Sequence, residues 1–115
     1  SVGYCMGGVF SYLCALDAGV DAAICYYAGG VTEYLPRANE LKVPVQFHFG
    51  AEDDHIPLEQ VEQTRQAFAG NKDVEVHLYG GAEHGFNCWA RESYHQRSAA
   101  LAHGRALTFL ANALS

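Results

Sequence analysis

The 115-residue sequence is poor in basic residues, with seven Lys and Arg against 13 Asp and Glu and a net charge of −6 when His is neutral. Nucleic acids and anionic membranes are bound by clusters of Lys and Arg, and the few present are scattered along the chain. No apolar run approaches the roughly 20 residues of a membrane span, and the N-terminus lacks the pattern of a signal peptide. We therefore expect a cytoplasmic protein that binds a small molecule, and neither nucleic acid nor a membrane.

Cysteine is also sparse, and its spacing excludes two further classes. The four cysteines form no CxxC pair and lack the density of a disulfide-rich scaffold, so we expect reduced thiols. Cys14 and Cys25 lie in apolar stretches, where cysteine behaves as a small hydrophobic residue. His84 and Cys88 are four residues apart, as zinc ligands can be, but no second pair accompanies them. The sequence thus implies no metal and no cofactor.

Half of the residues are apolar, which suffices for one compact domain over residues 1–115. The alternation of apolar runs with amphipathic segments predicts an α/β fold, a doubly wound and mostly parallel sheet with flanking helices. In the last predicted helix, Leu107, Leu110 and Leu114 are expected to form the apolar stripe. The predicted strands are residues 22–27, 45–49 and 74–78, the predicted helices are 9–18, 57–69 and 93–114, and 31–42 is a loop with at most a short helix.

The segment Gly3-Tyr4-Cys5-Met6-Gly7-Gly8 reads as a nucleophile elbow, a sharp turn from a strand into a helix. Crowding around the nucleophile predicts that only hydrogen fits at the flanking positions, Gly3 and Gly7. Taken alone, the pattern also suits a buried thiol in a tight turn.

Two further motifs follow predicted strands, where parallel sheets place their chemistry. Asp53 lies in an acidic loop directly after one strand, and His84 lies in a glycine-rich loop after the next. The order Cys5, Asp53, His84 is the nucleophile–acid–histidine order of α/β-hydrolases. Asp54 becomes the acid if the loop register shifts by one. Asp53 is otherwise a capping residue, and His84 an ordinary loop histidine.

Together these motifs resemble the dienelactone hydrolase family, the carboxymethylenebutenolidases. Residues 3–8 are similar to that family's elbow, residues 47–53 to its acid motif, and residues 81–86 to its histidine motif. The resemblance runs through the whole chain but covers only about the C-terminal half of a family member. It implies the C-terminal half of an α/β-hydrolase fold.

The resemblance also implies a set of roles in the hydrolysis of an ester or lactone. Cys5 is the nucleophile that forms an acyl-thioester, His84 is its base, and Asp53 orients the imidazole. The positive end of a helix dipole and a protonated histidine both favour the thiolate form of such a cysteine. The backbone N–H of Met6 is the expected oxyanion donor.

The sequence departs from the family where the substrate is held. An arginine follows the catalytic histidine by four positions in the best-known members, and Cys88 stands there in this chain, with Arg91 as the candidate substitute. Tyr26 and Tyr27 are expected in the core, and Tyr27 is also a candidate for the pocket wall. Residues 84–88 are similar to a widespread branch of the family whose substrates are mostly undefined.

Family members carry additional strands, a second oxyanion loop and a glutamate upstream of the elbow. We therefore expect the chain to be a fragment of a longer protein, or to be completed by another chain. The alternative is a truncated, inactive half-domain that self-associates through its sheet, because an unpaired apolar edge favours association. A thiol-based redox or binding role for Cys5 is disfavoured, because no resolving cysteine lies close in sequence.

Overall fold

A computed structural model describes residues 1–115 as a four-stranded parallel sheet with helices on both faces. The strand order β1-β2-β3-β4 follows the sequence, so each helical connection crosses to the next strand along the sheet. The predicted α/β fold class is confirmed. The elements are β1 (Val2–Tyr4), α1 (Met6–Asp17), β2 (Ala23–Tyr26), η1 (Val31–Glu40), β3 (Val45–Gly50), α2 (Leu58–Ala67), β4 (Val74–Tyr79) and α3 (Gln96–Ala113).

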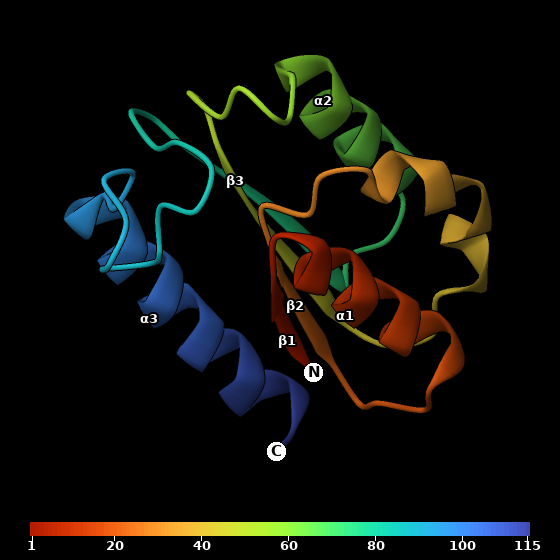
Figure 1. The fold of residues 1–115 in the computed structure, drawn as a ribbon. Coiled ribbons are helices and arrows are strands. Elements are labelled where there is room, and N and C mark those ends of the chain that lie inside the picture. The colour runs from red at the N-terminus through yellow and green to blue at the C-terminus, as the bar shows by residue number, and fades with distance from the viewer.

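Figure 1 shows the sheet between two helical layers, with α1, η1 and α2 on one side and α3 alone on the other. The alternation of side chains along β3 explains the layers, because successive residues of a strand point to opposite faces. Phe47 packs against Tyr12 of α1 and against Phe68, which follows α2. Gln46, by contrast, donates a hydrogen bond to the carbonyl of Arg105 in α3, at 3.2 Å. None of the helices combines the length and apolar composition needed to cross a membrane.

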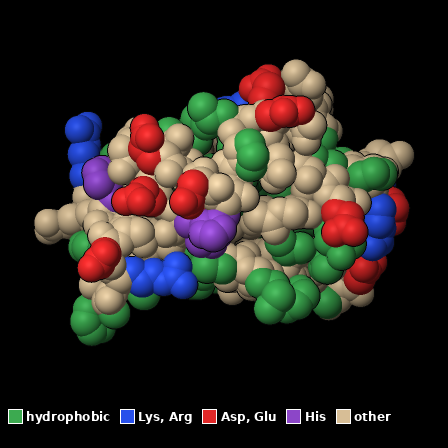
Figure 2. Space-filling model, turned by 45° about the horizontal axis from the view of Figure 1, so that its top comes forward, with side chains coloured by type: hydrophobic (Ala, Val, Ile, Leu, Met, Phe, Trp, Pro, Cys, Tyr) green, Lys and Arg blue, Asp and Glu red, His purple; other side chains and the backbone are tan.

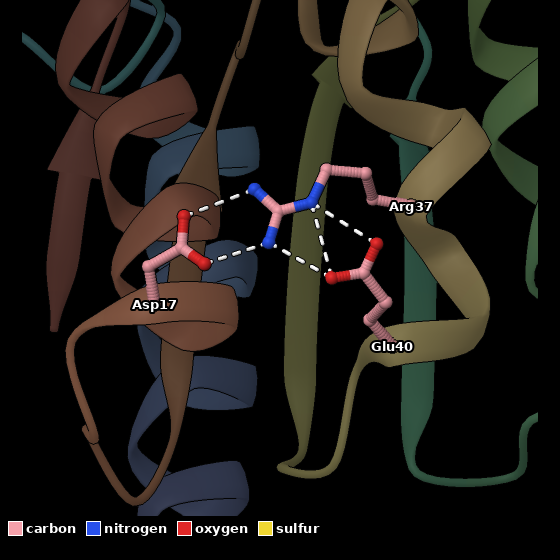
Figure 3. Close-up of polar contacts among 3 residues, drawn as sticks. All are labelled: Asp17, Arg37 and Glu40. Atoms are coloured by element: carbon pink, nitrogen blue, oxygen red, sulfur yellow. Dashed lines mark hydrogen bonds and ion pairs between the residues drawn. The ribbon is translucent and has the colours of Figure 1, made fainter.

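The segment predicted as a loop with at most a short helix forms the ten-residue 3-10 helix η1, with Pro36 inside it. Its polar face is held to α1 by Arg37, which donates to both carboxylate oxygens of Asp17 and also to Glu40 (Figure 3). The Arg37 guanidinium lowers the pKa of both carboxyl groups. The proline and the polar composition of this segment predicted a loop. Neither feature indicates that Arg37 pairs with Asp17 of another helix.

A row of aromatic rings crosses the α3 face of the sheet at one register level. Tyr4, Tyr26, His48 and His77 are paired in register across β1 to β4. Their ring centroids are separated by 4.7, 4.6 and 5.5 Å in turn, and each pair is stacked. The four strands are thus joined by side-chain packing as well as by backbone hydrogen bonds.

His48 is the buried polar centre of this row. Its Nε2–H donates to Oε1 of Gln46 at 2.7 Å, since an amide oxygen only accepts, and its Nδ1 then accepts from the hydroxyl of Tyr79 at 2.8 Å. Burial, with a contribution from His77, lowers the pKa of His48 to about 3. The ring is therefore neutral at physiological pH.

The apolar stripe predicted for the last helix is wrong. Leu107 and Leu114 are exposed and Leu110 is half-buried, whereas the face of α3 turned to the sheet consists of small residues and one ring. Both stripes have helical spacing, and side-chain size favoured the leucines. The small residues leave room for polar side chains of the sheet, as in the hydrogen bond from Gln46 to the carbonyl of Arg105. The buried residues of α3 are Ser98, Ala99, Ala102, Ala106 and Phe109.

Candidate active site

Cys5 sits between the end of β1 and the first residue of α1, in a backbone conformation that side chains rarely adopt. Its φ of 56° and ψ of −124° lie outside the helical and extended regions. The conformation is held by hydrogen bonds from its N–H to the carbonyl of Tyr26, at 3.0 Å, and from the Gly8 N–H to its own carbonyl, at 2.9 Å. Strain of this kind is characteristic of functional positions.

The glycines around Cys5 differ in what they allow. A Cβ on Gly3 would overlap the carbonyl of Gly7, as the elbow predicts. At Gly7 the prediction is wrong, because a Cβ there meets nothing within 4 Å. The second crowded position is Gly8, where a Cβ would lie 2.7 Å from the carbonyl oxygen of Tyr26. The helix thus packs on β2 through Gly8.

Asp53 follows β3 and its side chain is fully buried. Its Oδ1 accepts hydrogen bonds from the N–H groups of His55 (2.8 Å) and Ile56 (3.2 Å), and its Oδ2 lies 2.8 Å from Nδ1 of His84. The carboxylate only accepts, so Nδ1 of His84 carries the proton and Nε2 of the neutral ring is left as an acceptor. The neighbouring Asp54 is 91% exposed and lies near His55 instead. Asp53 therefore both caps its own turn and holds His84.

Gly50 explains how the acid and histidine loops come together. A Cβ on Gly50 would collide with the carbonyl of Ala82, so only glycine allows the two loops to touch here. The contact is fixed by hydrogen bonds from the Glu52 N–H to the carbonyl of Ala82 and from the Ala51 N–H to that of Tyr79, both at 2.8 Å. This close approach brings together Asp53 and His84, which are 31 residues apart in sequence.

The imidazole of His84 is partly exposed, at 18%, and lies between two other rings. The ring centroid of Tyr27 is 5.2 Å away and that of His55 is 4.7 Å away. No single motif of the sequence indicates the contact of His55 with His84. Figure 2 brings the upper part of Figure 1 forward, and on that surface histidine side chains (purple) lie beside acidic ones (red).

A pocket of about 400 Å³ opens beside Cys5. Tyr4, Cys5 and Tyr27 form one wall, and the loop of residues 85–91, which includes Cys88 and Arg91, forms the other. Arg91 lies across Gly85, next to His84. Cys5 makes no hydrogen bond to His84, so the structure joins Asp53 to His84 directly and brings Cys5 to the same side of the sheet without bonding it to them.

Tyr27, at the end of β2, is both a core residue and part of the pocket wall. Its φ is 37°, again in the left-handed region, and its N–H donates to the carbonyl of His48 at 2.7 Å. Burial first, and the neighbouring Cys5 next, raise the pKa of its hydroxyl, which therefore remains a donor. Met6 is the first residue of α1, so its N–H has no partner within the helix.

A model of the dienelactone hydrolase family matches residues 1–114 of the chain. The chain belongs to this family. It is 37% identical over 110 residues to carboxymethylenebutenolidases from Pseudomonas putida and Pseudomonas knackmussii, and the match covers 96% of the chain and 47% of each relative. The chain thus spans about half the length of these relatives.

Solved structures agree with the fold. The crystal structure of a Klebsiella pneumoniae protein, provisionally named a dienelactone hydrolase, superposes with a TM-score of 0.82 at 34% identity, covering 96% of this chain and 50% of that one. The Pyrococcus furiosus esterase Pf2001 superposes with a TM-score of 0.80 at 14% identity, covering 99% and 53%. At that identity the second match shows the fold alone. The resemblance drawn from the three motifs is confirmed at the level of the family.

Proposed function

We propose that the protein hydrolyses an ester or lactone of a small molecule, with Cys5 as the nucleophile, His84 as its base and Asp53 as the group that orients His84. The observation that supports this most strongly is the hydrogen bond between Nδ1 of His84 and the buried carboxylate of Asp53, at 2.8 Å. This hydrogen bond leaves Nε2 of His84 free to exchange protons at the carboxyl end of the sheet, where Cys5 lines the pocket. A carboxylate held on Nδ1 also stabilises the imidazolium formed during the reaction.

The reaction begins with a rotation of the Cys5 side chain, since its sulfur is not bonded to His84 in this structure. Nε2 of His84 then takes the proton of the Cys5 thiol, and the resulting thiolate adds to the substrate carbonyl. The carbonyl electrons move onto oxygen, and the tetrahedral intermediate forms. As the intermediate collapses, the C–O bond to the alcohol breaks and His84 donates the proton that the leaving oxygen takes. The product at this stage is an acyl-thioester on Cys5. Water, deprotonated by His84, attacks the thioester and releases the acid and Cys5.

The oxyanion of each tetrahedral intermediate needs a donor close to the nucleophile. The N–H of Met6 has no partner within α1 and belongs to the peptide group that directly follows Cys5. One such donor typically contributes about 3 kcal/mol of transition-state stabilisation. The hydroxyl of Tyr27 stays protonated and borders the same pocket, so it is a second donor available to the substrate.

The position of Arg91 supports a preference for substrates that carry an anionic group. It is the one Lys or Arg on the pocket wall, where it lies across Gly85. A guanidinium in this position pairs with an anionic group of the substrate, and a carboxylate matches its planar geometry. We therefore expect Arg91→Ala to raise KM for a carboxylate-bearing ester and to change KM little for an uncharged ester.

Hydrolysis of an activated aryl ester tests the proposal. Within a protein of the length of its relatives, the chain should release the phenolate with turnover, and both Cys5→Ala and His84→Ala should abolish it. Cys14→Ala is the matched control, because Cys14 lies on α1 away from the pocket and its substitution should leave the rate unchanged. Unchanged hydrolysis by Cys5→Ala would overturn the assignment of the nucleophile.

A second candidate concerns the 115-residue chain by itself, and the outer edge of β1 favours it. β1 pairs only with β2, and large apolar side chains are exposed at this edge and on the adjoining turns of α1, namely Val2, Tyr4, Met6 and Phe10. An unpaired strand with exposed apolar side chains pairs readily with another chain. We propose that the isolated chain self-associates along β1 and turns over little or no ester.

Sedimentation over a range of protein concentrations tests this second candidate. The wild-type chain should associate as concentration rises, and Val2→Lys should weaken the association, since a lysine blocks edge pairing. Thr32→Lys in η1 is a charge-matched control on another surface, and it should leave association unchanged. A chain that stays monomeric and hydrolyses the ester with full turnover would contradict self-association and inactivity together.

A further inference from the structure

The fold brings together two cysteines that are far apart in sequence. Cys5 and Cys88 both line the pocket of about 400 Å³, although 83 residues separate them. Both also lie near the hydroxyl of Tyr27, whose pKa is raised mainly by burial and further by these two cysteines. Sequence reasoning found no resolving cysteine close to Cys5, because proximity in this pocket arises only when the loop of residues 85–91 folds over the elbow.

The remaining two cysteines are not available to this pocket. Cys25 lies on β2, is fully buried, and has its pKa raised by burial, so its thiol is protected and unreactive. Cys14 lies within α1, eight residues beyond its first residue, Met6, which corresponds to roughly 12 Å along the helix axis. Cys88, in contrast, is exposed.

We propose that Cys5 and Cys88 form a reversible, redox-active thiol pair that closes the pocket when a peroxide oxidises it. The Cys5 thiolate attacks one oxygen of hydrogen peroxide, the O–O bond breaks, and with one proton the products are the sulfenic acid of Cys5 and water. The Cys88 thiol then attacks the sulfenic sulfur, the S–O bond breaks, and the oxygen leaves as a second water. The two sulfurs together lose two electrons, which reduce one peroxide to two waters.

The proposed bond requires the loop that carries Cys88 to bring this residue against Cys5. A disulfide needs its two α-carbons about 4.4–6.8 Å apart. The loop is held by turn hydrogen bonds, from the Cys88 N–H to the carbonyl of Gly85 at 2.9 Å and from the Arg91 N–H to that of Cys88 at 3.0 Å, and not by strand pairing. Gly85, with φ of 77°, is a point where the loop can turn without strain.

The disulfide would block Cys5 and would also protect its sulfur from further oxidation. A sulfenic acid without a partner proceeds to the sulfinic acid, which thiol reductants do not reverse. With Cys88 in the pocket, oxidation stops at the disulfide, and a cellular thiol restores both cysteines. This role depends on the two thiols only, so it goes beyond the proposed hydrolysis and does not require it.

Mass spectrometry of the peroxide-treated protein tests the pair without any measurement of activity. The wild-type chain should yield a peptide cross-linked between Cys5 and Cys88, lighter by two hydrogens and fully reversed by dithiothreitol. Trp89 lies on the same pocket and is the single tryptophan of the sequence, so its fluorescence should fall on oxidation, since disulfides quench tryptophan, and recover on reduction.

Two variants complete the experiment. Cys88→Ser changes an exposed side chain and should fold as the wild type does, but its Cys5 should pass to the sulfinic acid and lose reversibility. Cys14→Ser should form the same cross-link as the wild type. The proposal is overturned if wild type and Cys88→Ser oxidise Cys5 to the same irreversible product, or if the cross-link joins only separate chains. Loss of ester hydrolysis in Cys5→Ala bears on the proposed function and leaves this result untouched.

Discussion

The carbonyl group of Gly7 occupies the space in which a side chain on Gly3 would begin. The last residues of β1 therefore touch the first turn of α1, and the chain reverses sharply enough to leave Cys5 at the tip. Gly7 contributes its carbonyl to this contact, but its own α-carbon faces open space.

The two glycines should consequently respond in opposite ways to alanine. Gly3→Ala forces the strand and helix apart and should lower the free energy of unfolding by about 3 kcal/mol or more. Gly7→Ala places a methyl group in open space within a helix and should raise it by about 0.5–1 kcal/mol. Urea denaturation of both variants measures the difference. Equal effects at the two positions would contradict the close contact.

Removal of the hydroxyl group should affect the free energy of unfolding differently at two buried tyrosines, Tyr12 and Tyr79. The hydroxyl of Tyr12 is buried without a hydrogen-bond partner, so Tyr12→Phe should leave the free energy of unfolding unchanged or raise it by about 1 kcal/mol. The hydroxyl of Tyr79 donates to His48, so Tyr79→Phe should lower it by about 1–3 kcal/mol. Thermal or chemical denaturation distinguishes them. A larger loss in Tyr12→Phe than in Tyr79→Phe would show that the two hydroxyls are wrongly placed.

His48 should make the stability of the fold depend on pH. Its pKa is about 3 in the folded protein against 6.5 in an unfolded chain, so the unfolded state takes up a proton first as pH falls. The free energy of unfolding should therefore drop below pH 6.5 by about 1.4 kcal/mol per pH unit, until the folded state is protonated near pH 3. Urea denaturation at pH 7 and pH 5 should show a loss about 2 kcal/mol larger in wild type than in His48→Gln. An equal loss in both would rule out His48 as the cause.

Under the proposed mechanism, substitutions of the two adjacent aspartates should have different effects on kcat. Asp53→Asn removes the carboxylate that holds the proton on Nδ1 of His84, and kcat should fall about 10³–10⁴-fold. Asp54 is exposed, and Asp54→Asn should leave kcat near the wild-type value. Steady-state hydrolysis of an aryl ester measures both. A comparable fall in the two variants would place the acidic function elsewhere in the loop.

Local patterns in the sequence were sufficient to predict the fold class, the family, and the loops that carry Cys5, Asp53 and His84. These patterns depend on neighbours in the chain, because an elbow or a loop after a strand is encoded within a few residues. The contact of His55 with His84 and the place of Cys88 in the pocket arise from loops that meet in space. A pattern within one short segment does not indicate a contact between two distant loops.

Helix orientation and helix formation were predicted less well, for a related reason. The leucines of α3 and its buried alanines have the same spacing, so the spacing alone does not show which face turns to the sheet. Arg37 similarly finds Asp17 on another helix, 20 residues away, and η1 forms where proline indicated a loop. In both cases the deciding interaction is tertiary.

The order of the strands also explains the position of Tyr27. Cys5 follows β1, whereas Asp53 follows β3 and His84 follows β4, so β2 lies between the strand of the sulfur and the strands of the acid and base. Neighbouring strands lie about 4.8 Å apart, and that interval is fixed by backbone hydrogen bonds. The end of β2 must therefore fill the gap, and Tyr27 does so as a spacer. Its ring lines the pocket beside Cys5 and lies 5.2 Å from that of His84, so under the proposed function substitutions at Tyr27 should change which acyl groups fit while the strands stay in place.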